Sequence, residues 1–160
     1  MKIQIVFVLI MGCGLFACLN ENSILSNKQA DQVTSEVKGM LESYLQAVNQ
    51  NGLLAEFAYL DSTDQFSWFP PGFDGPISYD SVAAILKRTA GMYTSIHSEW
   101  DTLIILPATK ISAGYMGEMT SVMTDTTGRV LNFRFKEEGF VIKREDGWKL
   151  LNGKSILKDM

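Results

Sequence analysis

The sequence predicts an α+β domain in which the helices come first and antiparallel strands follow. Two observations support this prediction. From residue 31 to residue 94 the apolar residues recur mostly at helical spacing, interrupted by one loop that is rich in Pro and Gly. After Thr94 the chain consists of segments rich in β-forming residues, separated by short turns. Helices followed by a meander of strands are typical of the α+β class.

Three helices are expected before the strands. The first spans residues 31–50, with Asp31 as its N-cap and Gly52 as its stop signal. Its apolar stripe comprises Val33, Val37, Met40, Leu41, Tyr44, Leu45 and Val48. A second, short helix is expected to bury Leu53, Leu54, Phe57, Ala58 and Leu60. Ser78 is the expected cap of the third helix, whose apolar positions are Val82, Ile85, Leu86 and Tyr93.

Five strand segments are expected, and four of them form the antiparallel meander. A short segment around Phe66 and Trp68 precedes the loop "PPGFDGP". The other four cover residues 96–106, 110–124, 129–144 and 148–157. Pro107, "DTTG" and "EDG" mark the turns between them. Gly139 is expected to bend its strand or to form a bulge there.

The N-terminus predicts a secretory signal that ends in a lipidated cysteine. Lys2 is followed by a short apolar run over residues 3–16, which is the layout of a signal peptide. The run ends in "LFAC", which resembles the lipobox of bacterial lipoproteins at Leu15 and Ala17 and places the acylated residue at Cys18. Membrane lipid is therefore an expected partner through a palmitate-type anchor. The expected location is the bacterial cell envelope, on the periplasmic or outer-membrane side.

Three segments follow from this interpretation: a signal peptide at 1–17, a lipid anchor and tether at 18–31, and one domain at 32–160. Cys13 is a competing lipidation site, but cleavage there would leave the apolar "GLFACL" on the mature chain. An ordinary signal peptide or a short buried helix is the other alternative. Both cysteines lie in this N-terminal segment, so the domain is expected to lack disulfides and cysteine catalysis.

Composition excludes several classes of function. The formal net charge is −4 and no basic patch is present, so nucleic-acid binding is not expected. The chain contains a single histidine, which makes a zinc site improbable on ligand count. It has no P-loop, dinucleotide fingerprint or Ser/His/Asp set. No metal or other cofactor is therefore expected.

The order of elements resembles the nuclear transport factor 2-like superfamily, and its SnoaL-like members in particular. The resemblance rests on "VKGMLESYLQAVNQNG", "FPPGFDGPIS", "DTTGRV" and "EDGWKLLNGKS", in that order along residues 33–156. It implies a cone-shaped fold with three N-terminal helices packed on a strongly curved antiparallel sheet, with a pocket inside the cone. It also implies a homodimer formed through the outer face of the sheet.

The C-terminal motif departs from the family pattern at residues that bear on catalysis. Members often carry two histidines and a serine where this chain has Asn152, Lys154 and Ile156, and an aspartate where it has Gly52. The resemblance therefore favours a domain that binds a small apolar ligand or a protein partner without catalysis. The alternative is a SnoaL-like enzyme of the isomerase, cyclase or hydrolase kind, with an acid–base residue in the cone.

Two residues are candidates for that acid–base role. His97 shares one strand face with Glu99 and Asp101, and a histidine oriented by a carboxylate can act as a general base. The alternative is that this face is solvated. Glu118 lies among small and apolar residues, so a position inside the cone would raise its pKa. Its alternative is an exposed position on the convex face.

Aromatic residues provide the expected ligand pocket, because small-molecule sites are mostly apolar with a few polar groups that orient the ligand. Asn132 alternates with the apolar residues of its strand, so it lies either in the pocket or in solvent. The expected pocket residues are Tyr44, Trp68, Tyr93, Trp100, Tyr115 and Asn132.

Overall fold

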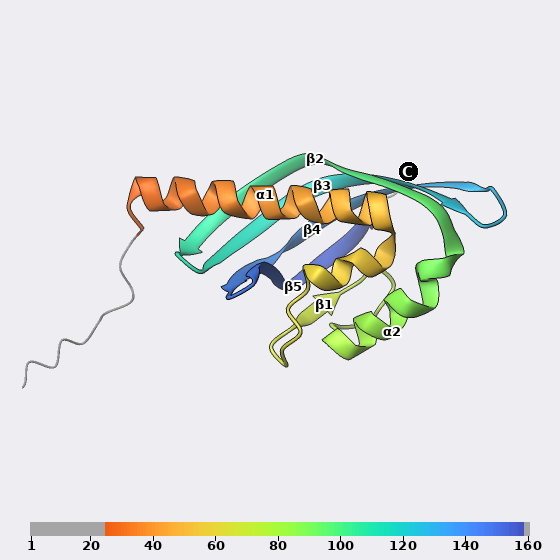
Figure 1. Cartoon of the computed structure of the whole chain (residues 1–160), viewed down its shortest axis with the longest axis horizontal. Coiled ribbons are helices and arrows are strands. Elements are labelled where there is room, and N and C mark those ends of the chain that lie inside the picture. Colours follow the sequence, from red (N-terminus) through yellow and green to blue (C-terminus); the bar gives the residue numbers. More distant parts are fainter. Residues whose placement is uncertain (1–24, 159–160) are drawn as a thin grey trace, which may run out of the picture.

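The computed structural model describes residues 25–158, which form helices packed on one curled sheet (Figure 1). The helices are α1 (Asn27–Asn51), the 3₁₀ helix η1 (Leu53–Ala58), α2 (Tyr79–Thr89) and the 3₁₀ helix η2 (Ala90–Met92). The strands are β1 (Ser67–Phe69), β2 (Tyr93–Thr109), β3 (Ser112–Asp125), β4 (Val130–Arg144) and β5 (Gly147–Lys158). The predicted α+β class is confirmed. The predicted signal segment, with Cys13 and Cys18, lies outside the described residues.

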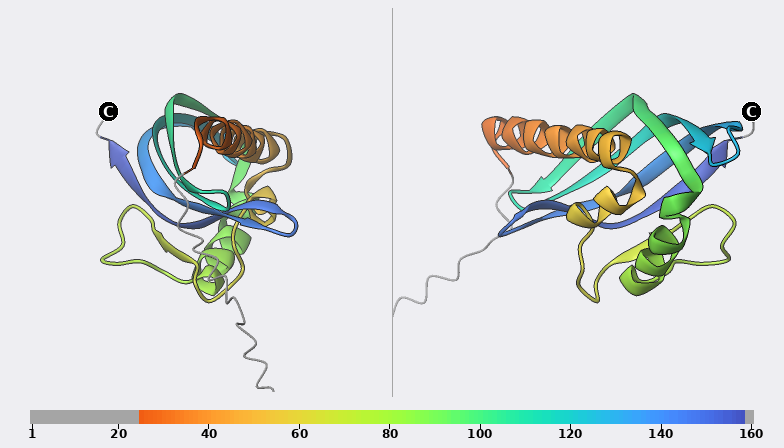
Figure 2. Two further views of the ribbon diagram at one scale, coloured as in Figure 1. Left: turned by 90° about the vertical axis from the view of Figure 1, so that its left-hand side faces the viewer. Right: turned by 45° about the vertical axis from the view of Figure 1, so that its right-hand side comes forward.

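The strands form one five-stranded sheet in the order β1-β5-β4-β3-β2. Strands β2 to β5 are the predicted antiparallel meander. Strand β1 pairs with β5 in parallel, with Ser67 opposite Asn152, so the sheet is mixed rather than wholly antiparallel. No hairpin joins β1 to β5, and their relative direction is therefore not fixed by a tight turn. The sheet curls around α1 without closing (Figure 2).

Helix α1 begins one turn earlier than predicted, inside the segment expected to be a tether. Ser26, not Asp31, is the N-cap, and it forms a capping box with Gln29. Gly52 ends the helix as predicted, with a φ of 77° that favours glycine. Ser78 caps α2 as predicted by accepting a hydrogen bond from the backbone N–H of Ser81.

The other two helices differ from their predictions in detail. The second helix has 3₁₀ geometry, and only Leu60, just beyond it, is fully buried, whereas Leu54 is 46% exposed. Ala58 is also exposed. The third helix ends at Thr89, and Tyr93 starts strand β2 instead of continuing the helical stripe.

Two facing glycines on β4 and β5 allow close packing at positions where a side chain would not fit. Gly139 on β4 lies opposite Gly153 on β5. A Cβ on Gly139 would approach the carbonyl oxygen of Asn152 to 2.4 Å, and one on Gly153 would lie 2.6 Å from the Trp68 ring. Strand β4 nevertheless runs through Gly139 without a break, and its register shift with β5 follows Phe140. The irregularity predicted at Gly139 therefore lies one residue further along β4, after Phe140.

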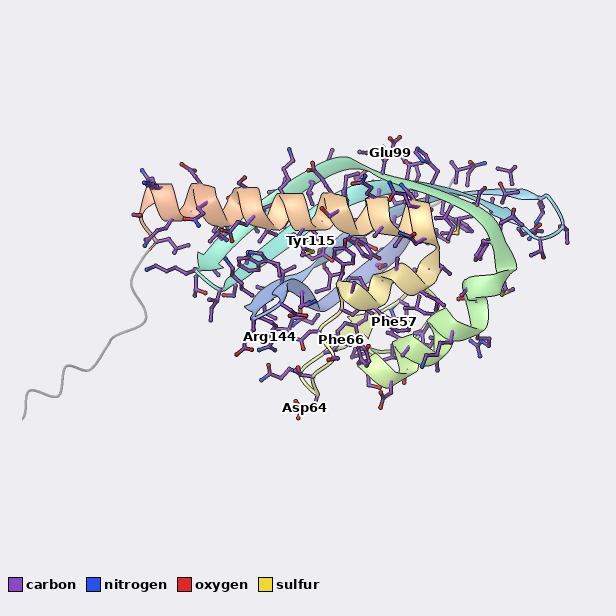
Figure 3. All side chains as sticks on the ribbon, viewed as in Figure 1. Phe57, Asp64, Phe66, Glu99, Tyr115 and Arg144 are labelled. Atoms are coloured by element: carbon purple, nitrogen blue, oxygen red, sulfur yellow. The ribbon has the colours of Figure 1, made fainter. Side chains whose placement is uncertain are left out.

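The core lies between α1 and the concave face of the sheet. Figure 3 shows Tyr115 beneath α1 and Phe66 near α2. The ring of Phe66 packs edge-on against Tyr79, with the ring centroids 5.9 Å apart. The buried cluster comprises Val33, Val37, Leu41, Leu60, Phe66, Leu86, Ala113, Tyr115, Val141, Trp148 and Leu150. None of the helices within residues 25–158 is both long and apolar enough to cross a bilayer.

Candidate functional site

A cavity of about 200 Å³ lies between the helices and the concave face of the sheet. All five strands, both α-helices and η1 contribute to its wall, so the whole fold is needed to form it. Its apolar and aromatic lining residues are Leu45, Leu60, Phe66, Trp68, Pro71, Val82, Met119, Met123, Phe135 and Leu150. Its polar lining residues are Tyr44, Glu56, Ser98, Ser121, Glu137 and Ser155.

Glu137 brings a carboxyl group to the cavity from β4. It has the same strand parity as Phe133 and Phe135, so it points to the concave face, and it is only 9% exposed. Ser155, directly opposite on β5, donates a hydrogen bond from its Oγ to Oε1 of Glu137 over 2.9 Å. Trp68 Nε1 donates in turn to Ser155 Oγ over 3.2 Å. Burial raises the pKa of Glu137 to about 7, and the Ser155 bond offsets part of that rise.

Glu56 brings the second carboxyl group from the opposite wall, on helix η1. Its residue is partly buried, while its carboxyl group faces the cavity. Burial, followed by the nearby Glu137 charge, raises the pKa of Glu56 to about 8. The Tyr44 hydroxyl favours the ionised form and offsets part of that shift. Burial also raises the pKa of Tyr44 well above its ordinary value.

Two serines form a neutral polar patch on another part of the wall. The Oγ atoms of Ser98 and Ser121 lie 2.8 Å apart and share a hydrogen bond. Asn49 accepts from the Ser98 backbone N–H over 2.7 Å and donates to its carbonyl over 2.8 Å. This pair of bonds ties the end of α1 to β2, so the wall is held rigidly beside the cavity.

Tyr115 lies in the core near the cavity without lining it. It is 2% exposed, and its hydroxyl has no hydrogen-bond partner within residues 25–158. Trp100 packs edge-on against it at a centroid distance of 6.2 Å. Burial, with a smaller contribution from the Glu137 charge, raises the pKa of Tyr115 well above its ordinary value. The Tyr115 hydroxyl is therefore a buried polar group that no hydrogen bond satisfies within residues 25–158.

The two predicted acid–base candidates lie outside this cavity. His97 is exposed on β2, beside Glu99, which Figure 3 shows at the periphery of the molecule. Glu118 points to the outer face of the sheet, where it pairs with Lys158 and with Arg134. The Lys158 hydrogen bond lowers the pKa of Glu118. Neither side chain can reach a molecule bound in the cavity.

The predicted pocket residues fall into two groups. Tyr44 and Trp68 line the cavity, and Tyr115 lies close to it. The other three do not line it: Trp100 donates from Nε1 to the Leu41 carbonyl over 3.4 Å, Tyr93 starts β2, and Asn132 is exposed on β4.

The C-terminal positions that departed from the family pattern do not face the cavity either. Asn152 and Lys154 line a separate, open groove, and Lys154 Nζ lies 4.9 Å from the centre of the Phe69 ring. Ser155, the residue after Lys154, has the opposite parity and points inward to Glu137. Asn152 and Lys154 therefore do not determine which chemistry the cavity supports.

Sequence reasoning missed Glu56 and Glu137. The alternation in "LNFRFKEE" carried a signal for Glu137, because it shares the parity of Leu131, Phe133 and Phe135. Glu56 carried none, since a short 3₁₀ helix has no strong periodicity by which to orient it. The described part of the chain contains no group of three His, Cys, Asp or Glu side chains that could hold a metal ion.

No protein-family model matches the chain, and no curated protein sequence matches it. Many solved structures do. A nuclear transport factor 2-like superfamily protein from Salmonella enterica serovar Typhimurium aligns with a TM-score of 0.68 at 12% identity, covering 81% of this chain and 94% of its own. The type 2 hexachlorocyclohexane dehydrochlorinase LinA aligns at 0.66 and 10% identity, covering 84% and 90%.

A third similar structure is a candidate scytalone dehydratase from Novosphingobium aromaticivorans, with a TM-score of 0.63 at 12% identity and coverage of 78% and 83%. The protein has the nuclear transport factor 2-like fold, as its sequence motifs predicted. The identities are too low to transfer an activity, because this fold carries different functions in different proteins.

Proposed function

We propose that this protein binds a small, largely apolar molecule, about the size of one aromatic ring, in the cavity between α1 and the sheet. The observation that supports this proposal is a mostly apolar cavity with a carboxyl group on each of two opposing walls, Glu56 and Glu137. The volume of about 200 Å³ is below the usual range for drug-sized ligands. An apolar cavity of roughly 150 Å³ is nevertheless large enough to hold benzene.

A cavity-filling variant tests this proposal. Met123→Trp places an indole at the wall, so it should abolish binding of single-ring compounds, measured by calorimetry or ligand-observed NMR. Met92→Trp is the matched control, since Met92 is 53% exposed and does not line the cavity. Binding that survives in a folded Met123→Trp protein would place the ligand elsewhere.

A second candidate function is proton-transfer catalysis, and the pair of carboxyl groups favours it. Near neutral pH, Glu137 is partly ionised and Glu56 is mostly protonated, because their pKa values are raised to about 7 and about 8. Two titratable groups kept in different protonation states are the usual acid and base of such a site. In an elimination, Glu137 would take a proton from carbon as the double bond forms, and Glu56 would protonate the leaving group.

The two candidate functions differ in what an amide substitution does. In an enzyme, Glu137→Gln should abolish turnover while leaving ligand affinity within a few-fold, because it removes the base and keeps the shape. Dehydrochlorinases are among the proteins of similar structure, so single-ring halides and alcohols with a removable C–H are the first substrates to try. Absence of turnover across such a panel, with binding retained, would leave the non-catalytic function.

We also propose that the chain is an envelope lipoprotein acylated at Cys18, as the "LFAC" motif predicts. Incorporation of a fatty-acid probe should be lost in Cys18→Ala and retained in Cys13→Ala. Labelling that persists in Cys18→Ala would contradict this proposal, and cell fractionation of the labelled protein would then identify its membrane.

We further propose that the outer face of the sheet pairs with a second copy of the chain. Exposed apolar side chains gather on that face at Ile104, Leu106 and Phe140, which are 54%, 49% and 53% exposed. Cross-strand pairing brings them near Met116 and Gly114. Ile104→Glu with Phe140→Glu should convert a dimer to a monomer in light scattering. A wild-type monomer at high concentration would contradict the proposal.

A further inference from the structure

The cavity wall has two groups that can carry negative charge and, among the described residues, no basic side chain to pair with them. No Lys, Arg or His lies among the described residues of its wall, although two carboxyl groups do. Within residues 25–158, Glu137 receives one side-chain hydrogen bond, from Ser155, and Glu56 interacts with the Tyr44 hydroxyl and with the Glu137 charge. A carboxylate buried without a counter-charge is costly, so this site differs from an ordinary structural ion pair.

Other carboxylates that contact the core of this protein have basic partners. Asp61, 2% exposed, receives hydrogen bonds from both Nε and Nη2 of Arg144. Glu36 pairs with Lys143 over 2.7 Å and also accepts from Trp148 Nε1. The fold therefore supplies cations to acids in two other places. Because no basic side chain lines the cavity among the described residues, a cation from outside the protein can pair with its carboxyl groups.

The remaining wall is suited to an organic cation. Four aromatic rings line the cavity, from Tyr44, Phe66, Trp68 and Phe135. Aromatic faces attract ammonium groups, and the attraction grows when water is excluded. An inorganic ion would leave the apolar surface of Leu60 and Val82 uncovered, whereas an aryl or alkyl group would cover it.

We propose that the ligand of this cavity is a small organic amine, bound as its ammonium ion, with the ammonium group between Glu137 and Glu56 and its apolar part against the aromatic wall. This inference rests on the proposed binding function and specifies the class of ligand. An anion of the same size would meet two carboxyl groups and no basic side chain among the described lining residues, so it should bind more weakly than the amine. A neutral molecule fills the same space but leaves the acids without a counter-charge.

Proton release is a direct consequence of this mode of binding. The titratable groups that face the cavity are Glu56, Glu137 and Tyr44, with Tyr115 nearby. In the free protein near neutral pH the two acids retain protons, since their pKa values lie at about 8 and about 7. An ammonium ion favours the ionised carboxylates, so binding releases protons to the solvent. The affinity should therefore rise with pH between about 6 and 8.

Three single-ring probes that differ in charge test the inference on the full chain: benzylammonium, benzyl alcohol and benzoate. Calorimetry at pH 7.5, repeated in buffers of different ionisation enthalpy, gives both the affinity and the protons released. We expect benzylammonium to bind at least tenfold more tightly than benzyl alcohol, with measurable proton release. Benzoate should not bind.

Glu137→Gln should weaken benzylammonium binding at least tenfold and leave benzyl alcohol binding unchanged. Glu138→Gln is the matched control, because Glu138 is the next residue on β4 and faces outward. Equal binding of amine and alcohol, without proton release, would overturn the amine proposal and leave the proposed binding function intact. Failure of all three probes to bind would count against both.

Discussion

Asp61 and Glu137 are both buried acids, but their surroundings give them opposite properties. Asp61 lies where the chain leaves η1 and meets β5, with its backbone N–H bonded to the Leu150 carbonyl. Burial alone would raise its pKa, but the Thr63 backbone N–H and Arg144 lower it below the ordinary value. Among the described residues, Ser155 is the only side chain that donates a hydrogen bond to Glu137, and burial raises the pKa of Glu137 to about 7. The surroundings of Asp61 stabilise the ionised carboxylate, whereas those of Glu137 favour the protonated acid.

The difference distinguishes a carboxylate that holds two parts of the fold together from one that faces the cavity without a basic partner among the described residues. Asp61 links the segment after η1 to β4 through Arg144, so its pair holds two parts of the fold together. Glu137 joins nothing beyond the β4–β5 pair that backbone bonds already hold. A buried acid that is unpaired, titrates near neutral pH and faces a cavity is a candidate functional group.

Among substitutions that test this difference, the largest expected effect on the free energy of unfolding is at Asp61. Asp61→Asn removes the charge and leaves Arg144 without its partner, which should destabilise the protein by about 2 to 3 kcal/mol. That is somewhat less than a fully buried pair, because Arg144 is partly exposed. Urea unfolding at pH 7 measures the loss. Asp64→Asn, an exposed neighbour, should change little, and equal effects of the two variants would contradict a structural role for the Arg144 pair.

Glu137 should show the opposite behaviour. Its raised pKa means that the folded protein retains a proton that the unfolded chain has already lost above pH 4.5. The stability that it contributes is fully present below that pH and is lost as pH rises through about 7. Glu137→Gln keeps the shape and the acceptor for Ser155 without the charge. We expect it to be more stable than wild type by about 1 to 3 kcal/mol at pH 9 and about equal at pH 4.5.

Urea unfolding across pH 4.5 to 9 measures this profile for wild type, Glu137→Gln and the control Glu138→Gln. Glu138 faces outward on the same strand, so its variant should follow the wild-type curve. A wild-type stability that rises between pH 5 and 9 would have the wrong sign for a raised carboxyl pKa. It would show that Glu137 is ionised and stabilised in the folded protein.

Glu56 should give a smaller effect of the same sign. Its residue is partly exposed, so water reduces the cost of ionising it. Part of its raised pKa also comes from the Glu137 charge. Glu56→Gln should therefore stabilise the protein at pH 9 by less than Glu137→Gln, about 1 kcal/mol or less. The double variant should gain less than the sum of the two single gains, since the carboxyls interact.

The sequence predicted the framework of this molecule better than its cavity. Caps and turns are local signals, so Ser78 and Gly52 could be placed correctly from a few neighbouring residues. The cavity is formed by residues from all five strands and three helices, and no local pattern states which of them converge. Of the residues expected at a ligand pocket, Tyr44 and Trp68 line this cavity, whereas Tyr93, Trp100 and Asn132 do not.

The missed acids show where the limit lies. Glu137 follows from the alternation of β4 once the parity of its two glutamates is assigned. To decide which of the two glutamates points inward, one must know which face of β4 is buried. The pair "EE" itself does not tell, because one of two consecutive strand residues always points inward and the other outward. For Glu118 the sequence left two positions open, inside the cone or on the convex face. The alternation of β3 directs Tyr115 and Met119 inward and Glu118 outward.

The smallest expected effects are at His97 and Glu118, the two acid–base candidates that the sequence offered. His97 is exposed, so His97→Gln should change the free energy of unfolding by less than about 0.5 kcal/mol. Glu118 meets Lys158 and Arg134 on the outer face, away from the cavity wall. Glu118→Gln should therefore leave benzylammonium affinity and its proton release unchanged, measured by the same calorimetry that detects the loss in Glu137→Gln. A tenfold loss of affinity in Glu118→Gln would place the binding site on the outer face of the sheet. A carboxylate with two basic partners would then be the one that binds the ligand, and the distinction between paired and unpaired acids would no longer hold.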